Sequence, residues 1–266
     1  MNRMMFLRSG FAMLALAVPA ACGGVIGWDN ADNDPYDSEN TFMEGQNGGN
    51  GFQPWVNLAG GTPGAMYLAE PSLRDEGLNS WGLSGTYAVG RGLTEAVTAG
   101  TWTFLASHGA GIGSFCGFNL RTSTNAGTFS DDEIFRFGVD YSQEGDTTRI
   151  YYSTNGGGDY GYLDLGEDSL LNVTLQYSVT WSTLSGTFTL AVLDLDASLY
   201  GEISGWLPAG APVAMLGAGI FEATLDEKMK FDDYGVAAVP EPAAAVLLCW
   251  GAFGLWAGRG RRCRRP

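Results

Sequence analysis

Apolar and polar residues alternate along several short stretches of this chain, and turns rich in Gly and Asn separate these stretches. The clearest alternation covers residues 101–107 and 133–140, where about every second residue is apolar. A period of two places successive side chains on opposite faces of a strand, with one face buried. No window sustains the period of 3.6 that an amphipathic helix requires. The pattern predicts an all-β fold.

Paired apolar stretches predict how neighbouring strands connect. Residues 149–152 and 161–165 flank a Gly-rich turn at 155–159, and 172–181 and 187–195 flank a turn at 183–186; each pair predicts a hairpin. Further strands are expected at 65–69, 86–90, 115–121, 220–224 and 229–236. About ten short strands with closely spaced turns predict an antiparallel jelly-roll sandwich. The polar stretch 29–51 predicts a long loop or an irregular first strand.

The N-terminal residues depart from this pattern. Arg3 and Arg8 precede an apolar stretch at 11–18, and small residues surround Ala20. This order predicts a signal peptide at 1–20 with cleavage after Ala20. The alternative is a lipoprotein with a lipidated Cys22, although a proline stands three residues before it, where a leucine is typical.

The C-terminal residues predict a membrane anchor. Residues 243–258 contain no charge and reach roughly 24 Å as a helix, close to the thickness of a hydrocarbon core. This stretch predicts one transmembrane helix. The basic residues that follow it are Arg259, Arg261, Arg262, Arg264 and Arg265. The positive-inside rule places this basic tail, 259–266, in the cytoplasm and the body outside, in the exported compartment.

A short proline motif joins the body to this anchor. Val239, Pro240, Glu241 and Pro242 form an extended segment, because both prolines fix φ and lack an N–H. With the helix and the basic end, residues 239–266 resemble the PEP-CTERM sorting signal of Gram-negative bacteria. The resemblance implies export, arrest in the inner membrane, processing by an exosortase-type transpeptidase and a place at the cell surface or in an exopolysaccharide matrix. The alternative is a tail-anchored protein in which the motif is accidental.

The body between these ends, residues 21–238, is strongly acidic. The signal peptide and the tail hold seven of the 14 Lys and Arg residues but only one of the 29 acidic residues, so the body has seven basic against 28 acidic residues, a net charge of −21. Such a charge repels nucleic acid, which is excluded as a partner. Cys22 and Cys116 permit one disulfide, but the apolar strand around Cys116 favours a buried thiol.

The body has a second resemblance, carried by five short segments in order. These are Trp28-Asp29-Asn30, residues 46–55, Ser80-Trp81-Gly82-Leu83, the strand at 134–140 and residues 229–236. Their order is similar to that in concanavalin A/laminin-G-like jelly rolls. The resemblance implies one domain in which the last strand pairs near the first, and some members bind carbohydrate or calcium.

This sequence offers only weak candidates for catalytic residues. A glycosidase of this kind needs two carboxylates on the same face of one strand. The nearest candidates are Asp194 with Asp196 and the acidic residues at 164–168, and neither matches the usual spacing. His108 is the only histidine, and no nucleophile elbow accompanies it. The sequence predicts a protein that is not an enzyme, with a glycoside hydrolase as the second alternative.

Binding residues are better represented. Trp102 and Trp181 lie within strands and are predicted core residues, whereas Trp55, Trp81 and Trp206 lie near turns and are candidates for sugar stacking; the aromatic side chain of Tyr160 is also available. Clustered carboxylates suggest one structural calcium ion. Its candidate ligands are Asp29, Asp232 and Asp233, and the residues Asp32, Asp34 and Asp37 lie near the first of them.

These observations predict an exported, non-catalytic protein of the cell surface or extracellular matrix. No organic cofactor is expected, and the expected partners are the export machinery, an exosortase-type transpeptidase, the inner membrane and polysaccharide. The first alternative is a lectin-like module that binds carbohydrate.

Overall fold

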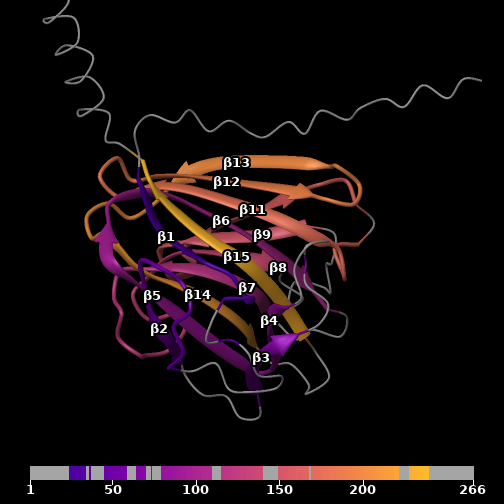
Figure 1. The fold of residues 1–266 in the computed structure, drawn as a ribbon. Helices are drawn as coiled ribbons and strands as arrows, with labels where there is room; N and C mark the ends of the chain where they lie inside the picture. The colour runs from indigo at the N-terminus through magenta and orange to yellow at the C-terminus, as the bar shows by residue number, and fades with distance from the viewer. Residues whose placement is uncertain are drawn as a thin grey trace, which may run out of the picture.

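The computed structural model describes residues 24–33, 36, 45–58, 64–69, 73, 79–109, 115–139, 149–167, 169–221 and 228–239. Within them the chain forms 15 strands and one short 3₁₀ turn, η1 (Asn155–Gly157), with no α-helix. The all-β prediction is therefore confirmed. The strands form two antiparallel sheets that pack face to face as a sandwich (Figure 1).

The first sheet, sheet A, has eight strands. In spatial order they are β13 (Tyr200–Trp206), β12 (Thr187–Asp194), β11 (Thr174–Ser182), β6 (Ala99–His108), β15 (Lys228–Ala238), β4 (Ser80–Gly85) and β3 (Gly64–Ala69), and β1 (Val25–Asp29) pairs with β15. The pairing of the first described strand with the last, with Trp28 opposite Gly235, confirms that the two ends of the body meet.

The second sheet, sheet B, has seven strands. Their order is β10 (Asp159–Asp164), β9 (Arg149–Thr154), β8 (Glu133–Val139), β7 (Phe115–Arg121), β14 (Val213–Phe221), β5 (Tyr87–Val97) and β2 (Phe52–Asn57). Both predicted hairpins, β9–β10 and β11–β12, are present with continuous antiparallel register.

Four strands were not predicted from the sequence, namely β1, β2, β4 and β13, and one was misplaced. The strand expected at 220–224 begins earlier, as β14, because its residues are apolar without alternation and nearly all are buried on both faces. In β13 the inward positions are Gly201, Ile203 and Gly205, so only one of the three carries an apolar side chain. A Cβ on Gly205 would lie 2.6 Å from the Phe188 ring, so the missing side chain makes room for that ring.

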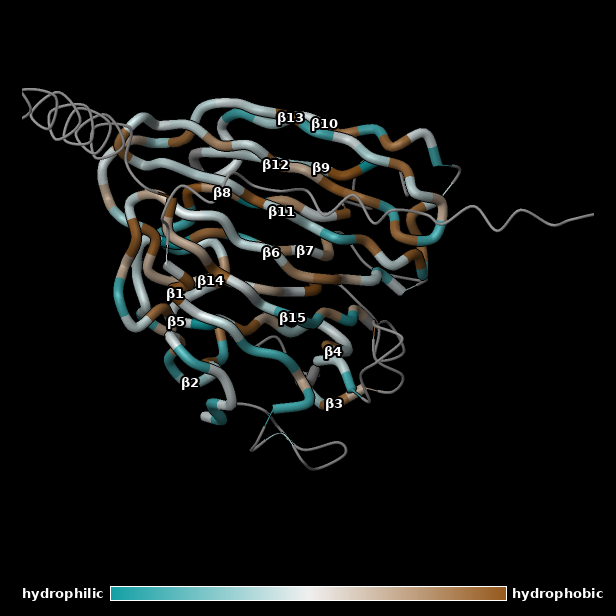
Figure 2. Tube along the Cα trace, turned by 45° about the horizontal axis from the view of Figure 1, so that its top comes forward, coloured by the Kyte–Doolittle hydropathy of each residue, from teal (hydrophilic) through white to brown (hydrophobic). Residues whose placement is uncertain are grey.

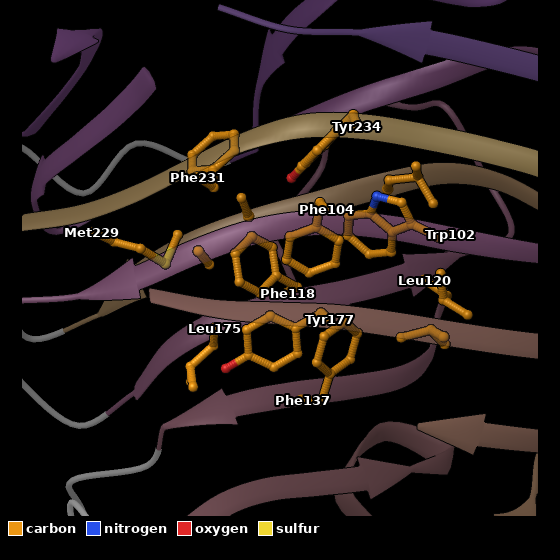
Figure 3. Close-up of a cluster of buried hydrophobic side chains, with 14 of the residues drawn as sticks. Trp102, Phe104, Phe118, Leu120, Phe137, Leu175, Tyr177, Met229, Phe231 and Tyr234 are labelled. Atoms are coloured by element: carbon orange, nitrogen blue, oxygen red, sulfur yellow. The ribbon is translucent and has the colours of Figure 1, made fainter. Parts of the chain in front are cut away.

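Aromatic side chains dominate the core between the sheets. Trp102 and Phe104 from sheet A face Phe118 and Phe137 from sheet B (Figure 3), and Phe104 stacks on Tyr177 with ring centroids 5.1 Å apart. Figure 2 shows hydrophobic and hydrophilic residues interleaved along the strands of both sheets. Trp102 and Trp181 are fully buried here, as the sequence predicted. Burial of these large rings contributes hydrophobic free energy that holds the two layers together.

Candidate functional site

Three tyrosines gather on the outward face of sheet B, at the edge formed by β9 and β10. Tyr162 lies opposite Tyr151 in the register, and Tyr160 is two residues before Tyr162, so all three side chains leave the same face. The ring centroids are 5.9 Å apart for Tyr151 and Tyr162, 6.3 Å for Tyr151 and Tyr160, and 6.4 Å for Tyr160 and Tyr162. We call Tyr151, Tyr160 and Tyr162 the tyrosine cluster.

The tyrosine cluster is open to solvent and has a cation beside it. Tyr160 is 65% exposed, and the other two rings are half-buried. The Arg149 guanidinium lies 4.5 Å from the centroid of the Tyr162 ring, a cation–π contact. Arg149 is also opposite Asp164 across the hairpin. The edge therefore presents aromatic faces together with charged and hydroxyl groups that can donate or accept hydrogen bonds.

A strip of aromatic rings continues from the cluster across sheet B. Tyr151 lies in one row with three glycines, Gly138, Gly117 and Gly219, on successive strands. These glycines leave space over the sheet, and the Phe115 ring lies there, 6.3 Å from Tyr151 and 6.2 Å from Phe221. Phe115 is buried, so the strip has its exposed end at the tyrosine cluster.

The outward face of sheet A carries hydroxyl groups instead. Along β6, β11 and β12 the outward residues include Thr101, Thr180 and Thr189, with Thr101 and Thr180 hydrogen-bonded at 2.9 Å. Trp206 ends β13 at the edge of this face, opposite Thr187, and is 76% exposed. Among the predicted sugar-stacking tryptophans, Trp206 alone is accessible.

Trp55 and Trp81 are fully buried, which corrects their assignment as sugar-stacking residues. Their rings pack against each other at 5.3 Å and both contact Tyr234. The Trp55 indole N–H donates to the Tyr36 hydroxyl at 3.1 Å. Both residues lie on short strands near turns, but their side chains face the inner layer, and no sugar can reach them.

Asp29 belongs to a buried ion pair, which argues against its assignment as a calcium ligand. Its Oδ2 accepts a hydrogen bond from Arg91 at 2.5 Å and another from the Tyr36 hydroxyl at 2.9 Å, and its Oδ1 accepts one from Asn33 at 3.0 Å. Asp29 and Arg91 are both completely buried. The carboxylate is neutralised by the guanidinium, so the pair has a structural role in joining β1 to β5.

The other two predicted calcium ligands lie on β15. Asp232 Oδ1 accepts hydrogen bonds from the backbone N–H of Ala31 at 3.0 Å and of Asp233 at 2.8 Å. Burial raises the pKa of Asp232 to about 7, and the charges of Asp233 and Asp32 add to this increase. Within the described residues no three His, Cys, Asp or Glu side chains are grouped as a metal site. Asp34 and Asp37 lie outside those residues.

The acidic residues considered for a glycosidase serve local turns. Asp194 is buried, and its Oδ1 accepts hydrogen bonds from the backbone N–H of Asp196 at 2.8 Å and of Ala197 at 2.9 Å. Asp164 accepts one from the backbone N–H of Gly166 at 2.7 Å. His108 is the buried last residue of β6.

The predicted targeting segments lie almost entirely outside the described residues. This applies to Ala20, Cys22, Pro240, Glu241, Pro242, the helix at 243–258 and the basic tail. Val239 is the last described residue, and its N–H donates to the Ala99 carbonyl at 3.2 Å. In the described part of the chain no helix is long and apolar enough to cross a membrane. Cys116 is a buried thiol on β7, as predicted.

Sequence reasoning missed Tyr151, Tyr162 and Arg149 as candidate binding residues. Both strands of their hairpin were predicted, but the alternation alone does not say which face is open. The detectable signal was the excess of aromatic residues on one face of this hairpin. Only Tyr160 was noted as an available aromatic residue.

No family model matches the chain, and no curated protein matches it. Among solved structures, it is similar to the globular domain of calreticulin from T. cruzi, with a TM-score of 0.50, 11% identity, and coverage of 84% of this chain and 92% of that one. It is also similar to lectin II from Ulex europaeus (TM-score 0.48, 7% identity, 76% and 100% coverage). A third similar structure is domain 4 of AbnA, an extracellular arabinanase from Geobacillus stearothermophilus, in complex with arabinotriose (TM-score 0.47, 10% identity, 84% and 97% coverage). The calreticulin similarity shows the fold alone, a sandwich of two antiparallel sheets.

Proposed function

We propose that this chain is an exported, non-catalytic carbohydrate-binding protein of the cell surface or extracellular matrix. The observation that carries the proposal is the tyrosine cluster, three rings on one outward face with Tyr160 65% exposed. Tyrosine combines a large apolar ring with a polar hydroxyl. The apolar C–H face of a sugar ring packs on such a surface, while its hydroxyls bond to Arg149 and the tyrosine hydroxyls.

The charge of the body selects the kind of polysaccharide. The net charge of −21 for residues 21–238 repels acidic polymers over the range of the Debye length. Arg149 and Arg136 are the cations on the outward face of this edge of sheet B. Two cations do not offset the overall field, so the proposed ligand is a neutral polysaccharide.

The binding experiment compares variants of the full-length protein, held in a detergent without a sugar head group, against a panel of neutral polysaccharides. Tyr160→Ala is expected to weaken binding roughly 10- to 30-fold, because loss of a central aromatic anchor typically costs about 1.4–2 kcal/mol. Trp206→Ala is the matched control, an equally exposed aromatic residue on the other sheet, and is expected to bind as the unmodified protein does.

Two outcomes contradict the proposed site or function. If Trp206→Ala loses binding and Tyr160→Ala keeps it, the ligand binds the hydroxyl-rich face of sheet A. If the unmodified protein binds no polysaccharide of the panel, the function itself is wrong. Acidic polysaccharides are tested alongside the neutral panel, and tight binding to these polymers would overturn the charge argument.

The proposal includes sorting by the C-terminal segment. The Pro-Glu-Pro motif at 240–242, the uncharged stretch and five arginines support export, arrest in the inner membrane with the C-terminus in the cytoplasm, and cleavage by an exosortase-type transpeptidase. The body would then stay at the cell surface or enter the matrix.

Mass spectrometry of the mature C-terminus tests this sorting. In a host that carries an exosortase, the mature protein is expected to lack residues 243–258. Replacing Pro240 and Pro242 with Ala should leave the segment attached, because the motif can then continue the helix, while Pro208→Ala in the body should be processed normally. Retention of the segment in the unmodified protein would contradict the sorting proposal and leave the binding proposal unaffected.

A further inference from the structure

Two sulfur atoms and an imidazole nitrogen meet at one end of the core. His108 is the last residue of β6 and is paired in register with Met229, the second residue of β15, while Cys116 approaches from β7 of the opposite sheet. Cys116 Sγ lies 3.2 Å from His108 Nδ1 and 3.1 Å from Met229 Sδ. All three residues are 0% exposed. Figure 3 shows the Met229 sulfur at this end of the cluster of buried rings.

The imidazole is oriented by a partner behind it. His108 Nε2 lies 2.9 Å from the Tyr177 hydroxyl, which leaves Nδ1 facing the cysteine sulfur. Imidazoles that bind metals typically have their second nitrogen held in this way. A neutral imidazole keeps a lone pair on the ring nitrogen that carries no proton.

The donor set selects the ion by its chemistry. Thiolate, thioether and imidazole are soft or intermediate donors, a combination that suits Cu(I), whereas calcium and magnesium require oxygen donors. We propose that His108, Cys116 and Met229 form a three-coordinate site for Cu(I) inside the sandwich.

The charge of the site favours a monovalent ion. One thiolate and one Cu(I) ion have no net charge, so the apolar core holds the complex without an unpaired charge. A divalent ion would leave a net positive charge buried in the apolar core, which is unfavourable. In the binding step the S–H bond breaks, a S–Cu bond forms and the proton leaves to solvent. No electron is transferred.

Entry of the ion has a structural route. His108, Cys116 and Met229 all lie within two residues of a strand end, and strand ends open with lower free energy than strand centres. Loading is therefore expected to follow local opening of one end of the sandwich, without separation of the two sheets.

The test is an anaerobic Cu(I) titration of the full-length protein against a chromophoric Cu(I) chelator. Cys22, Cys249 and Cys263 are first replaced by Ser, because these thiols also bind copper. We expect one Cu(I) per chain, one proton released per ion, and an X-ray absorption spectrum with two sulfur neighbours and one nitrogen neighbour.

Variants distinguish Cu(I) binding at this site from binding by other sulfur-containing side chains. Cys116→Ser is expected to abolish stoichiometric binding, and Met229→Leu to weaken it about tenfold while keeping the core volume. Met66→Leu is the matched control, a buried methionine of sheet A, and should bind as its parent does. Circular dichroism verifies that each variant is folded. Cu(I) binding that survives both Cys116→Ser and Met229→Leu, no binding by the parent, or tighter binding of Zn(II) than of Cu(I) would each overturn the proposal.

Discussion

Replacing Arg91 with methionine is expected to lower the free energy of unfolding by about 3–5 kcal/mol at pH 7. The guanidinium donates to Asp29 at 2.5 Å, to Asn47 at 2.7 Å and to the Gln53 carbonyl at 2.6 Å. It also lies 5.0 Å from the Trp55 ring centroid. Methionine preserves much of the volume but leaves the Asp29 carboxylate charged and buried, and an unpaired buried charge is the costly outcome.

Urea unfolding followed by tryptophan fluorescence measures this change. The double variant Arg91→Met with Asp29→Asn removes both charges and is expected to recover part of the loss, which a double-mutant cycle reports as coupling. Glu95→Gln is the control, because Glu95 is an exposed charge on the same strand, and should change stability by no more than about 0.5 kcal/mol. Strictly additive effects of the two single substitutions would contradict the ion-pair explanation.

Raising the pH from 4 to 8 is expected to destabilise the protein through Asp232 by about 3–4 kcal/mol. Burial raises its pKa to about 7 in the folded state, against an ordinary value of 3.8. Between these values the folded state holds a proton that the unfolded state has lost, so stability falls as the pH rises through this range and is constant above it. Each unit of difference corresponds to about 1.4 kcal/mol.

Unfolding curves of the unmodified protein and of Asp232→Asn at several pH values isolate this effect. The variant has no titrating group there, so its free energy of unfolding should fall less between pH 4 and 8, and the difference between the two proteins should grow with pH. Parallel pH profiles would show that folding does not raise the pKa of Asp232. Adding calcium is expected to change neither profile, and stabilisation by calcium would indicate that an ion holds this carboxylate.

The two proposals use different parts of the sandwich. The tyrosine cluster lies on the outward face of sheet B, and the proposed Cu(I) site of His108, Cys116 and Met229 lies between the sheets at the ends of β6, β7 and β15. A substitution in one region is therefore expected to leave the other unchanged. This separation lets the polysaccharide and copper experiments serve as controls for each other.

Local alternation was sufficient to find most strands, because a half-buried strand imposes a period of two on its own residues. The strands that the alternation missed or misplaced carry different patterns. In β14 both faces are buried and the alternation disappears, while in β13 glycines occupy inward positions under the Phe188 and Leu165 side chains. In both cases the cause is packing by another part of the chain, which a local window does not contain.

The tryptophans show the same limit of prediction from a local sequence window. The sequence places Trp55, Trp81 and Trp206 near turns, yet Trp55 and Trp81 are buried and Trp206 is 76% exposed. The difference depends on which side of each strand faces the other sheet. Trp206 lies on the edge strand β13 and points outward, whereas Trp55 and Trp81 point into the core against Tyr234.

The sequence by itself determined the all-β class, the acidic body and the two predicted hairpins, because these depend on composition and on neighbours close in the chain. The tertiary structure alone decided which residues meet across long separations. Asp29 pairs with Arg91, Tyr151 lies with Tyr160 and Tyr162 on an open face, and Cys116 contacts Met229, which is 113 residues away in the chain. Such contacts depend on strand order and on the face that each strand buries, and both are set by the packing of the whole sandwich.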